Sequence, residues 1–310
     1  GNKYKQPKDK LHTYNQHLHC LFINGSENIT IDSCQFYSSG GDGMVIRGKK
    51  GGILSKKVLV SNSRFNNNHR NGISIGGGFI GIEIKSSWFG ESIDDSPIDS
   101  EPYGGICENI FIHHNLFNTT SSLLTLGGHS TVSNYLIENN VFNGTSIYMV
   151  RAKNVIIRNN EMTVMNTKKN RPVFYIQNNN SNVLIEKNNV KTNIPLLYIL
   201  ATKYGIPSDI TFNNNTIQVE AVDRELILIQ GANSISVTSN NVQSSSKSLF
   251  PLIRLKPYFP MNGIVVSHNL LVGYNAEFID KKRIDSKRIS NLVFENNTQD
   301  NSISPTIRLK

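Results

Sequence analysis

The residues best suited to chemistry form a short acidic run in the first third of the chain. In Ile98-Asp99-Ser100-Glu101 the residue types alternate as they do along a β-strand, so Asp99 and Glu101 face the same side. Two residues along a strand separate their Cα atoms by roughly 6.5 to 7 Å, and flexible side chains then reach either carboxyl spacing of the glycoside hydrolases. The pair predicts general acid and base catalysis on a glycosidic bond, with the stereochemistry left open.

The charge distribution indicates the same segment. The 310 residues carry a net charge of +9, yet residues 61–130 hold 3 basic and 7 acidic residues. Carboxylates gathered in a basic protein repel one another, which raises some pKa values unless a proton, cation or substrate is shared. We therefore expect an acidic groove whose catalytic candidates are Asp99, Glu101 and Asp95. Hydrolysis requires no cofactor, but the candidate ligands for a divalent cation such as Ca²⁺ are Asp94, Asp95, Asp99 and Glu101.

Seven further residues are expected to bind substrate, because they lie in the same acidic stretch or in segments that stack beside it. They are Asp42, His69, Arg70, Asn71, Trp88, Asp94 and His113. Asp42, within Gly-Gly-Asp-Gly, equally suits a turn, and His113 equally suits a plain surface position. Trp88 is the only tryptophan; it is either an outward platform for a sugar ring or a side chain buried under a loop.

These segments are positioned by a repeat that runs down the chain. The pattern apolar, x, apolar, x, polar, Asn or Ser, x, apolar is met, with small departures, eleven times from ITIDSCQF to LVFENNTQ, at steps of 20 to 29 residues. Such variable steps are typical of a solenoid whose loops differ in length. A second apolar stretch, such as MVIRG or LLYIL, precedes the next copy, and no segment has a useful helical pattern. The sequence predicts an all-β solenoid of about eleven coils over residues 21–310, with residues 1–20 as a cap or connector.

The side chains at equivalent positions of the repeat are expected to stack in columns. Asparagine accounts for 41 residues and occupies the sixth position of the last eight copies, which predicts a hydrogen-bonded ladder of short side chains that tolerate left-handed backbone geometry. The three cysteines are too scattered for disulfides and are expected in the core. The predicted aromatic column is Phe36, Phe65, Phe89, Phe117 and Phe142, and the aliphatic column is Ile31, Val60, Ile84, Ile112, Ile137, Ile157 and Ile185.

This repeat resembles that of the right-handed parallel β-helix proteins of the pectate-lyase-like class. Within it, NHRNGISI followed about 25 residues later by SPIDSEP is similar to a pattern of bacteriophage tailspikes and phage-like tail depolymerases, in which Gly-Ile-Asp-x-Glu-Pro follows an Asn-Gly-Ile strand. Here Ser96-Pro97 replace a small residue and glycine, and Ser100 replaces an apolar residue. The resemblance implies a glycan groove at Asp99 and Glu101, a homotrimer, and an extracellular or virion-tail location.

Three functions are open at this point. The first is a tailspike-like depolymerase that hydrolyses a bacterial surface polysaccharide or teichoic acid in a groove on coils two to four. The second is a Ca²⁺-assisted polysaccharide lyase with His69 or Arg70 as base, and the third is a receptor-binding or structural adhesin that does not cleave. A nucleic-acid partner is disfavoured because no aromatic residues interleave the basic ones. Membrane insertion is not expected, because the sequence has no run of about 18 apolar residues.

Overall fold

The computed structural model is an all-β parallel β-solenoid of about nine turns. It describes residues 18–49, 52–92, 96–165, 171–220, 222–245, 250–273, 277–280, 284, 287–300 and 302–309. The chain divides into two compact units, residues 1–145 (unit 1) and 146–310 (unit 2), and each unit is itself a stack of parallel strands. In this described part of the chain, no helix has the length and hydropathy needed to cross a membrane.

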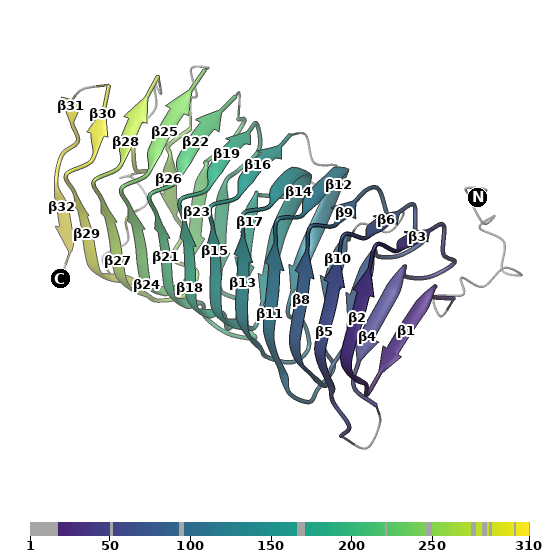
Figure 1. Ribbon diagram of the computed structural model, residues 1–310. Coiled ribbons are helices and arrows are strands. Elements are labelled where there is room, and N and C mark those ends of the chain that lie inside the picture. The colour runs from purple at the N-terminus through teal and green to yellow at the C-terminus, as the bar shows by residue number, and fades with distance from the viewer. Residues whose placement is uncertain are drawn as a thin grey trace, which may run out of the picture. The chain divides into compact units, whose positions relative to one another are not determined.

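Each turn of unit 1 contributes strands to three faces, and within a face each strand pairs in parallel with its equivalent on the next turn (Figure 1). The first face, which we call the groove face, contains β1 (Leu21–Asn24), β4 (Met44–Arg47), β7 (Ile73–Ile75), β10 (Ile98–Ser100) and the end of β12 (Leu116–Leu126). The second face contains β2 (Glu27–Asp32), β5 (Ser55–Ser61), β8 (Phe79–Lys85), β11 (Cys107–His113) and β13 (Val132–Glu138). The third face contains β3 (Gln35–Tyr37), β6 (Arg64–Asn66), β9 (Trp88–Phe89) and the start of β12.

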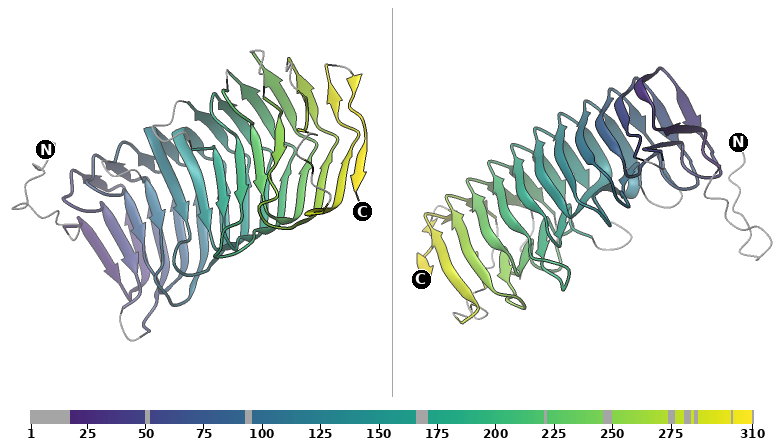
Figure 2. Two further views of the ribbon diagram at one scale, coloured as in Figure 1. Left: turned by 180° about the vertical axis from the view of Figure 1, so that it is seen from behind. Right: turned by 90° about the horizontal axis from the view of Figure 1, so that it is seen from below.

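Unit 2 has strands of the same three kinds, drawn in green to yellow in Figure 2. The first kind comprises the end of β14 (Val141–Val150), β17 (Phe174–Gln177), β20 (Leu197–Leu200), β23 (Ile227–Gln230) and β26 (Ile253–Leu255). The second comprises β15 (Ala152–Arg158), β18 (Ser181–Glu186), β21 (Ser208–Asn213), β24 (Asn233–Thr238), β27 (Met261–Ser267) and β29 (Ile289–Glu295). The third comprises β16 (Glu161–Val164), β19 (Asn189–Thr192), β22 (Thr216–Val219), β25 (Asn241–Ser244), β28 (Leu270–Val272) and β30 (Thr298–Gln299).

The chain reverses after the last copy of the repeat. Strands β31 (Ser302–Ile303) and β32 (Ile307–Leu309) pair antiparallel with β30 and β29. The final copy therefore starts no further turn. The solenoid has about nine turns, slightly fewer than the eleven coils expected. The reversal also pairs an edge strand that would otherwise present free backbone groups.

The predicted aromatic column lies in the core of unit 1, and the aliphatic column continues into unit 2. The rings of Phe36, Phe65, Phe89, Phe117 and Phe142 stack in sequence order, with centroids 4.6 to 4.9 Å apart. The aliphatic column is buried in both units. The prediction for the cysteines was wrong for two of three: Cys107 is buried, but Cys34 is half-buried and Cys20 is exposed. Cys20 lies two residues before the outward-facing Phe22, so strand alternation turns it to solvent as well.

The asparagine ladder is present in each unit. Asn188 shows its geometry: its Oδ1 accepts bonds from the backbone N and the Nδ2 of Asn160, at 3.0 and 2.9 Å, and its Nδ2 donates to Asn215 Oδ1 at 3.0 Å. The expectation that the ladder residue itself is left-handed was wrong. The left-handed residue is the one before it, such as Asn214 with φ 52°, because that residue turns the chain and thereby points the next side chain inward.

Candidate functional site

A groove of about 570 Å³ opens on the groove face of unit 1. The strand register builds it from two outward-facing rows. In the first row Phe22, Val45, Ser74 and Asp99 lie on successive rungs. One step further along the strands, Arg47 lies beside Gly76, and Glu101 is two residues beyond Asp99. The rung between β4 and β10 forms the floor, where β7 places the short side chain of Ser74 outward and Gly76, directly after β7, has no side chain.

Strand β10 presents its two sides as the sequence predicts. Ile98 and Ser100 point into the core and are buried, whereas Asp99 lines the groove. The Ser100 hydroxyl shares a hydrogen bond of 2.6 Å with the Tyr135 hydroxyl, which is also buried. Ser100 is tolerated in the core because its hydroxyl is hydrogen-bonded to that of Tyr135. Glu101 follows directly after β10, is exposed, and lines the same groove.

Asp99 has the environment of a carboxylic acid that keeps its proton near neutral pH. Its pKa is raised from the ordinary 3.8 to about 7, chiefly by burial and then by the negative charges of Glu101 and Asp42. The Arg70 guanidinium and a hydrogen bond from Asn71 act in the opposite direction. Asn71 Nδ2 lies 3.3 Å from Asp99 Oδ2, which leaves Oδ1 to carry the proton.

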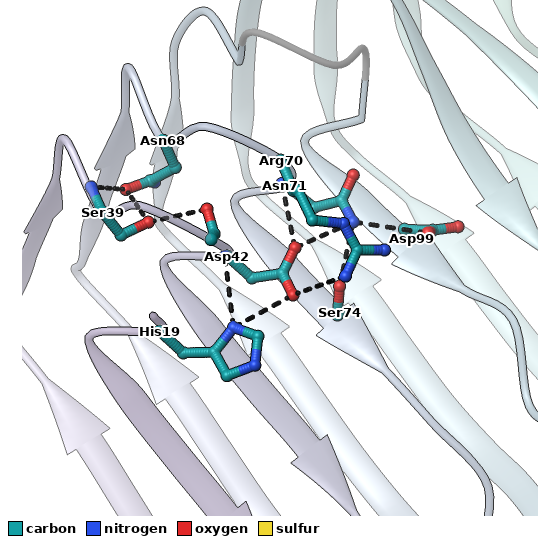
Figure 3. Close-up of polar contacts among 9 residues, drawn as sticks. His19, Ser39, Asp42, Asn68, Arg70, Asn71, Ser74 and Asp99 are labelled. Carbon is teal, nitrogen blue, oxygen red and sulfur yellow. Dashed lines mark hydrogen bonds and ion pairs between the residues drawn. The ribbon is translucent and has the colours of Figure 1, made fainter. Parts of the chain in front are cut away.

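Asp42 is the hub that holds these groups in place (Figure 3). Its side chain is buried, and its Oδ1 accepts bonds from the backbone N and the Nδ2 of Asn71 at 3.1 and 3.0 Å. Its Oδ2 lies 3.2 Å from His19 Nδ1 and 3.5 Å from Arg70 Nη1. The Asn71 amide nitrogen therefore contacts both Asp42 and Asp99, and it also donates to Ser74 Oγ at 2.9 Å. The two carboxyl groups are linked through one amide.

Exposed aromatic rings stand at the sides of the groove. Phe22 is 43% exposed and stacks on His19, and the Arg47 guanidinium carbon lies 4.7 Å from the centre of its ring. Tyr103 is 76% exposed, with its ring 4.5 Å from that of His129. Exposed aromatic rings are surfaces that sugar rings pack against, so the groove has binding surface as well as acids.

The structure brings together five of the residues predicted for the site: Asp42, Arg70, Asn71, Asp99 and Glu101. Asp94 and Asp95 lie outside the described residues. Among the residues that are described, no group of three or more His, Cys, Asp or Glu side chains has the geometry to hold a metal ion.

Trp88 and His113 lie on other faces of unit 1. Trp88, on the third face, lines a separate hollow of about 370 Å³ with Arg64 and His114. His113, on the second face, contacts Glu83 through Nε2 at 3.1 Å. His69 precedes Arg70 but does not line the groove, and its backbone N donates to the Ser39 carbonyl at 3.0 Å.

Sequence reasoning missed eight residues that line the groove: His19, Phe22, Val45, Arg47, Ser74, Ile75, Gly76 and Tyr103. Aligning the apolar stretches LFIN, MVIR and ISIG by their alternation would have placed Phe22 and Ser74 in one outward row with Asp99. His19 carried no such signal, because it precedes the first strand in a segment that looked like a connector.

Comparisons with known proteins do not identify a family or a function for this chain. No protein-family model matches the chain, and no curated protein matches it in sequence. The fold and the groove support a protein that binds polysaccharide or acts like a depolymerase, and they carry the functional argument alone.

Proposed function

We propose that this protein is a glycan depolymerase that hydrolyses a polysaccharide strand in the groove of unit 1. The observation that carries the proposal is the pair of groove carboxyl groups in contrasting environments. Asp99 has a pKa raised to about 7 by burial and by nearby charge, whereas Glu101 is exposed. Two carboxyl groups whose surroundings differ in this way are suited to the separate roles of acid and base.

In this proposal Asp99 is the general acid. Its protonated Oδ1 gives a proton to the glycosidic oxygen as the bond to the sugar carbon breaks, so the leaving sugar departs as an alcohol. Glu101 either removes a proton from the attacking water or attacks the sugar carbon itself. Asn71 keeps Asp99 oriented, and Asp42 in turn keeps Asn71 oriented.

The test is turnover by variants that keep the shape of each acid. Asp99→Asn and Glu101→Gln should each lower the release of reducing ends from a panel of bacterial surface polysaccharides by about 10² to 10⁴-fold. Asp209→Asn is the matched control, because Asp209 is an exposed aspartate of unit 2 that does not line the groove. Unchanged circular dichroism shows that the variants fold. Wild-type rates in both groove variants contradict the assignment.

Binding without cleavage is the second candidate, and the exposed Phe22 and Tyr103 favour it because they offer binding surface that needs no chemistry. Under that proposal the wild-type protein retains a polysaccharide and leaves its chain length unchanged. A lyase is the third candidate, and it would release unsaturated ends that absorb near 235 nm. The cation that we expected to assist it has two of its four candidate ligands outside the described residues.

The identity of the polymer rests on the resemblance to phage tail proteins. That resemblance supports a bacterial surface polysaccharide or teichoic acid as substrate, a homotrimer, and a site of action outside the cell on a virion or phage-like tail.

A further inference from the structure

The groove contains a cation whose charge is not matched by any carboxylate in the part of unit 1 that the structure describes. Arg47, at the end of β4, is exposed, lines the groove and forms no ion pair with a described residue. Its guanidinium carbon lies 4.7 Å from the centre of the Phe22 ring. That contact holds the plane of the guanidinium while leaving its N–H donors available to a ligand.

Gly76, on the neighbouring rung, makes room for the Arg47 side chain. A Cβ atom at Gly76 would lie 3.1 Å from Arg47 Cβ and 3.8 Å from its Cδ, so the arginine stem lies along the bare backbone of Gly76. A larger residue at this position would meet that stem and would also fill the floor. The absence of a side chain at Gly76 therefore leaves room for the Arg47 stem and keeps the groove floor clear.

The other charged groups of the groove are already engaged or lie on its opposite side. Arg70 contacts Asp42, which also contacts His19. Asp99 and Glu101 lie on the β10 side, and Arg47 lies on the β4 side, with β7 between them. At a spacing of about 4.8 Å per rung, the backbones of β4 and β10 are roughly 10 Å apart. The groove is thus polarised: Asp99 and Glu101 lie on the β10 side, whereas on the β4 side Asp42 is paired with Arg70 and His19, and Arg47 has no ion pair with a described residue.

We propose that the groove takes an acidic glycan, and that Arg47 binds an oxyanion substituent of that glycan, a carboxylate or a phosphate. The guanidinium fork pairs with both groups through two parallel N–H···O bonds. A strand bound in this way turns its charged edge away from Asp99 and Glu101 and its glycosidic oxygen toward Asp99. The inference deepens the function proposed above by naming the substrate class and a specificity-determining residue.

The experiment measures binding and not turnover, so that it stands apart from the test of catalysis. The probes are uronate-containing bacterial polysaccharides, the same polymers after carboxyl reduction, which replaces CO₂⁻ by CH₂OH, and poly(glycerol phosphate). The proteins are Asp99→Asn, which under the proposed function should shorten the probe far more slowly than the wild type, and the same variant with Arg47→Gln or Arg64→Gln added. Arg64 is the matched control, because it is also exposed without a described ion pair but lies on the third face.

We expect an acidic polymer to bind at least about tenfold more tightly than its neutral partner, the size of one charge-assisted contact. Arg47→Gln should remove this preference and the accompanying salt dependence, and Arg64→Gln should leave both unchanged. A preference for the uronate probes identifies the substituent as a carboxylate, and a preference for poly(glycerol phosphate) identifies it as a phosphate.

Three results would overturn the inference: binding to neutral polymers alone, equal affinity before and after carboxyl reduction with no affinity for the phosphate polymer, or equal losses in the two arginine variants. Failure to bind any acidic probe counts against it as well. Cleavage that depends on Asp99 but not on substrate charge would leave the proposed hydrolysis intact and refute the role of Arg47 alone.

Discussion

The titration of Asp99 is the most direct test of the site. The pKa of this carboxyl group is raised from 3.8 to about 7; burial is the largest cause, and the negative charge of Glu101 is the next. Glu101→Gln removes that charge but not the burial. We therefore expect the pKa of Asp99 in this variant to fall while staying above 3.8, because the larger cause is still present.

The same shift predicts how stability depends on pH. Because the raised pKa belongs to the folded state, the native protein binds more protons than the unfolded chain between pH 3.8 and about 7. The contribution of Asp99 is therefore fully present below about pH 4 and is lost as the pH rises through 7. The difference between the two pKa values corresponds to at most roughly 4 kcal/mol in the free energy of unfolding, and partial exposure of Asp99 reduces this contribution to about 2 kcal/mol. Asp99→Asn should thus stabilise the protein by about 2 kcal/mol relative to wild type above pH 8.

Two measurements check this expectation. Carbon-13 NMR of the side-chain carboxyl carbons gives the midpoint of Asp99 in the wild type and in Glu101→Gln. Thermal unfolding at pH 4 and pH 8 compares Asp99→Asn with Asp209→Asn, a control at an exposed left-handed position with φ 53°, where several other coils have asparagine. A midpoint near pH 4, or equal changes of stability at pH 8 in the two asparagine variants, refutes the reasoning.

Two further predictions concern the core. Asn188→Ala leaves the backbone N of Asn160 without its acceptor and breaks the bond to Asn215. We therefore expect thermal unfolding to show that the free energy of unfolding falls by about 2 to 4 kcal/mol. A fall of less than about 1 kcal/mol would mean that the ladder does not stabilise the fold. Ser100→Ala leaves the buried Tyr135 hydroxyl without a hydrogen-bond partner and should lower the free energy of unfolding by about 1 to 3 kcal/mol. Adding Tyr135→Phe should recover most of that loss. Additive losses in the double variant would contradict the pairing.

The fold was predictable because it depends on residue types at equivalent positions. Stacking like on like buries Phe65 on Phe89 and bonds Asn188 to Asn215 whatever the loops between them do. The number of turns was predicted less closely: each of the eleven copies supplies one strand of the second face, yet the solenoid has about nine turns. The left-handed residue was misplaced by one position, since asparagine occurs both at the turn, as at Asn214, and in the ladder.

The site was predictable only where charge marked it. Asp99 and Glu101 stand out in an acidic segment of a basic chain, but Phe22 and Arg47 carry no such mark. They become groove residues through the register of the groove face, which places Phe22 in one outward row with Asp99 and Arg47 beside Gly76. Trp88, a reasonable sugar platform by type, lies on the third face, because its place in the repeat assigns it to β9 and not to β10.

A solenoid also restricts where a groove can form, and this explains the position of the site. Rungs of a parallel sheet are evenly spaced at about 4.8 Å, so the backbone alone offers no hollow and depth must come from contrast in side-chain size. Unit 1 has this contrast where Ser74 and Gly76 lie between the larger residues of β4 and β10. The corresponding outward row of unit 2 runs through Tyr148, Tyr175, Tyr198, Leu228 and Arg254 without a small residue. A search for small residues flanked by large ones in an outward row is therefore a better guide to a solenoid's site than a search for acids alone.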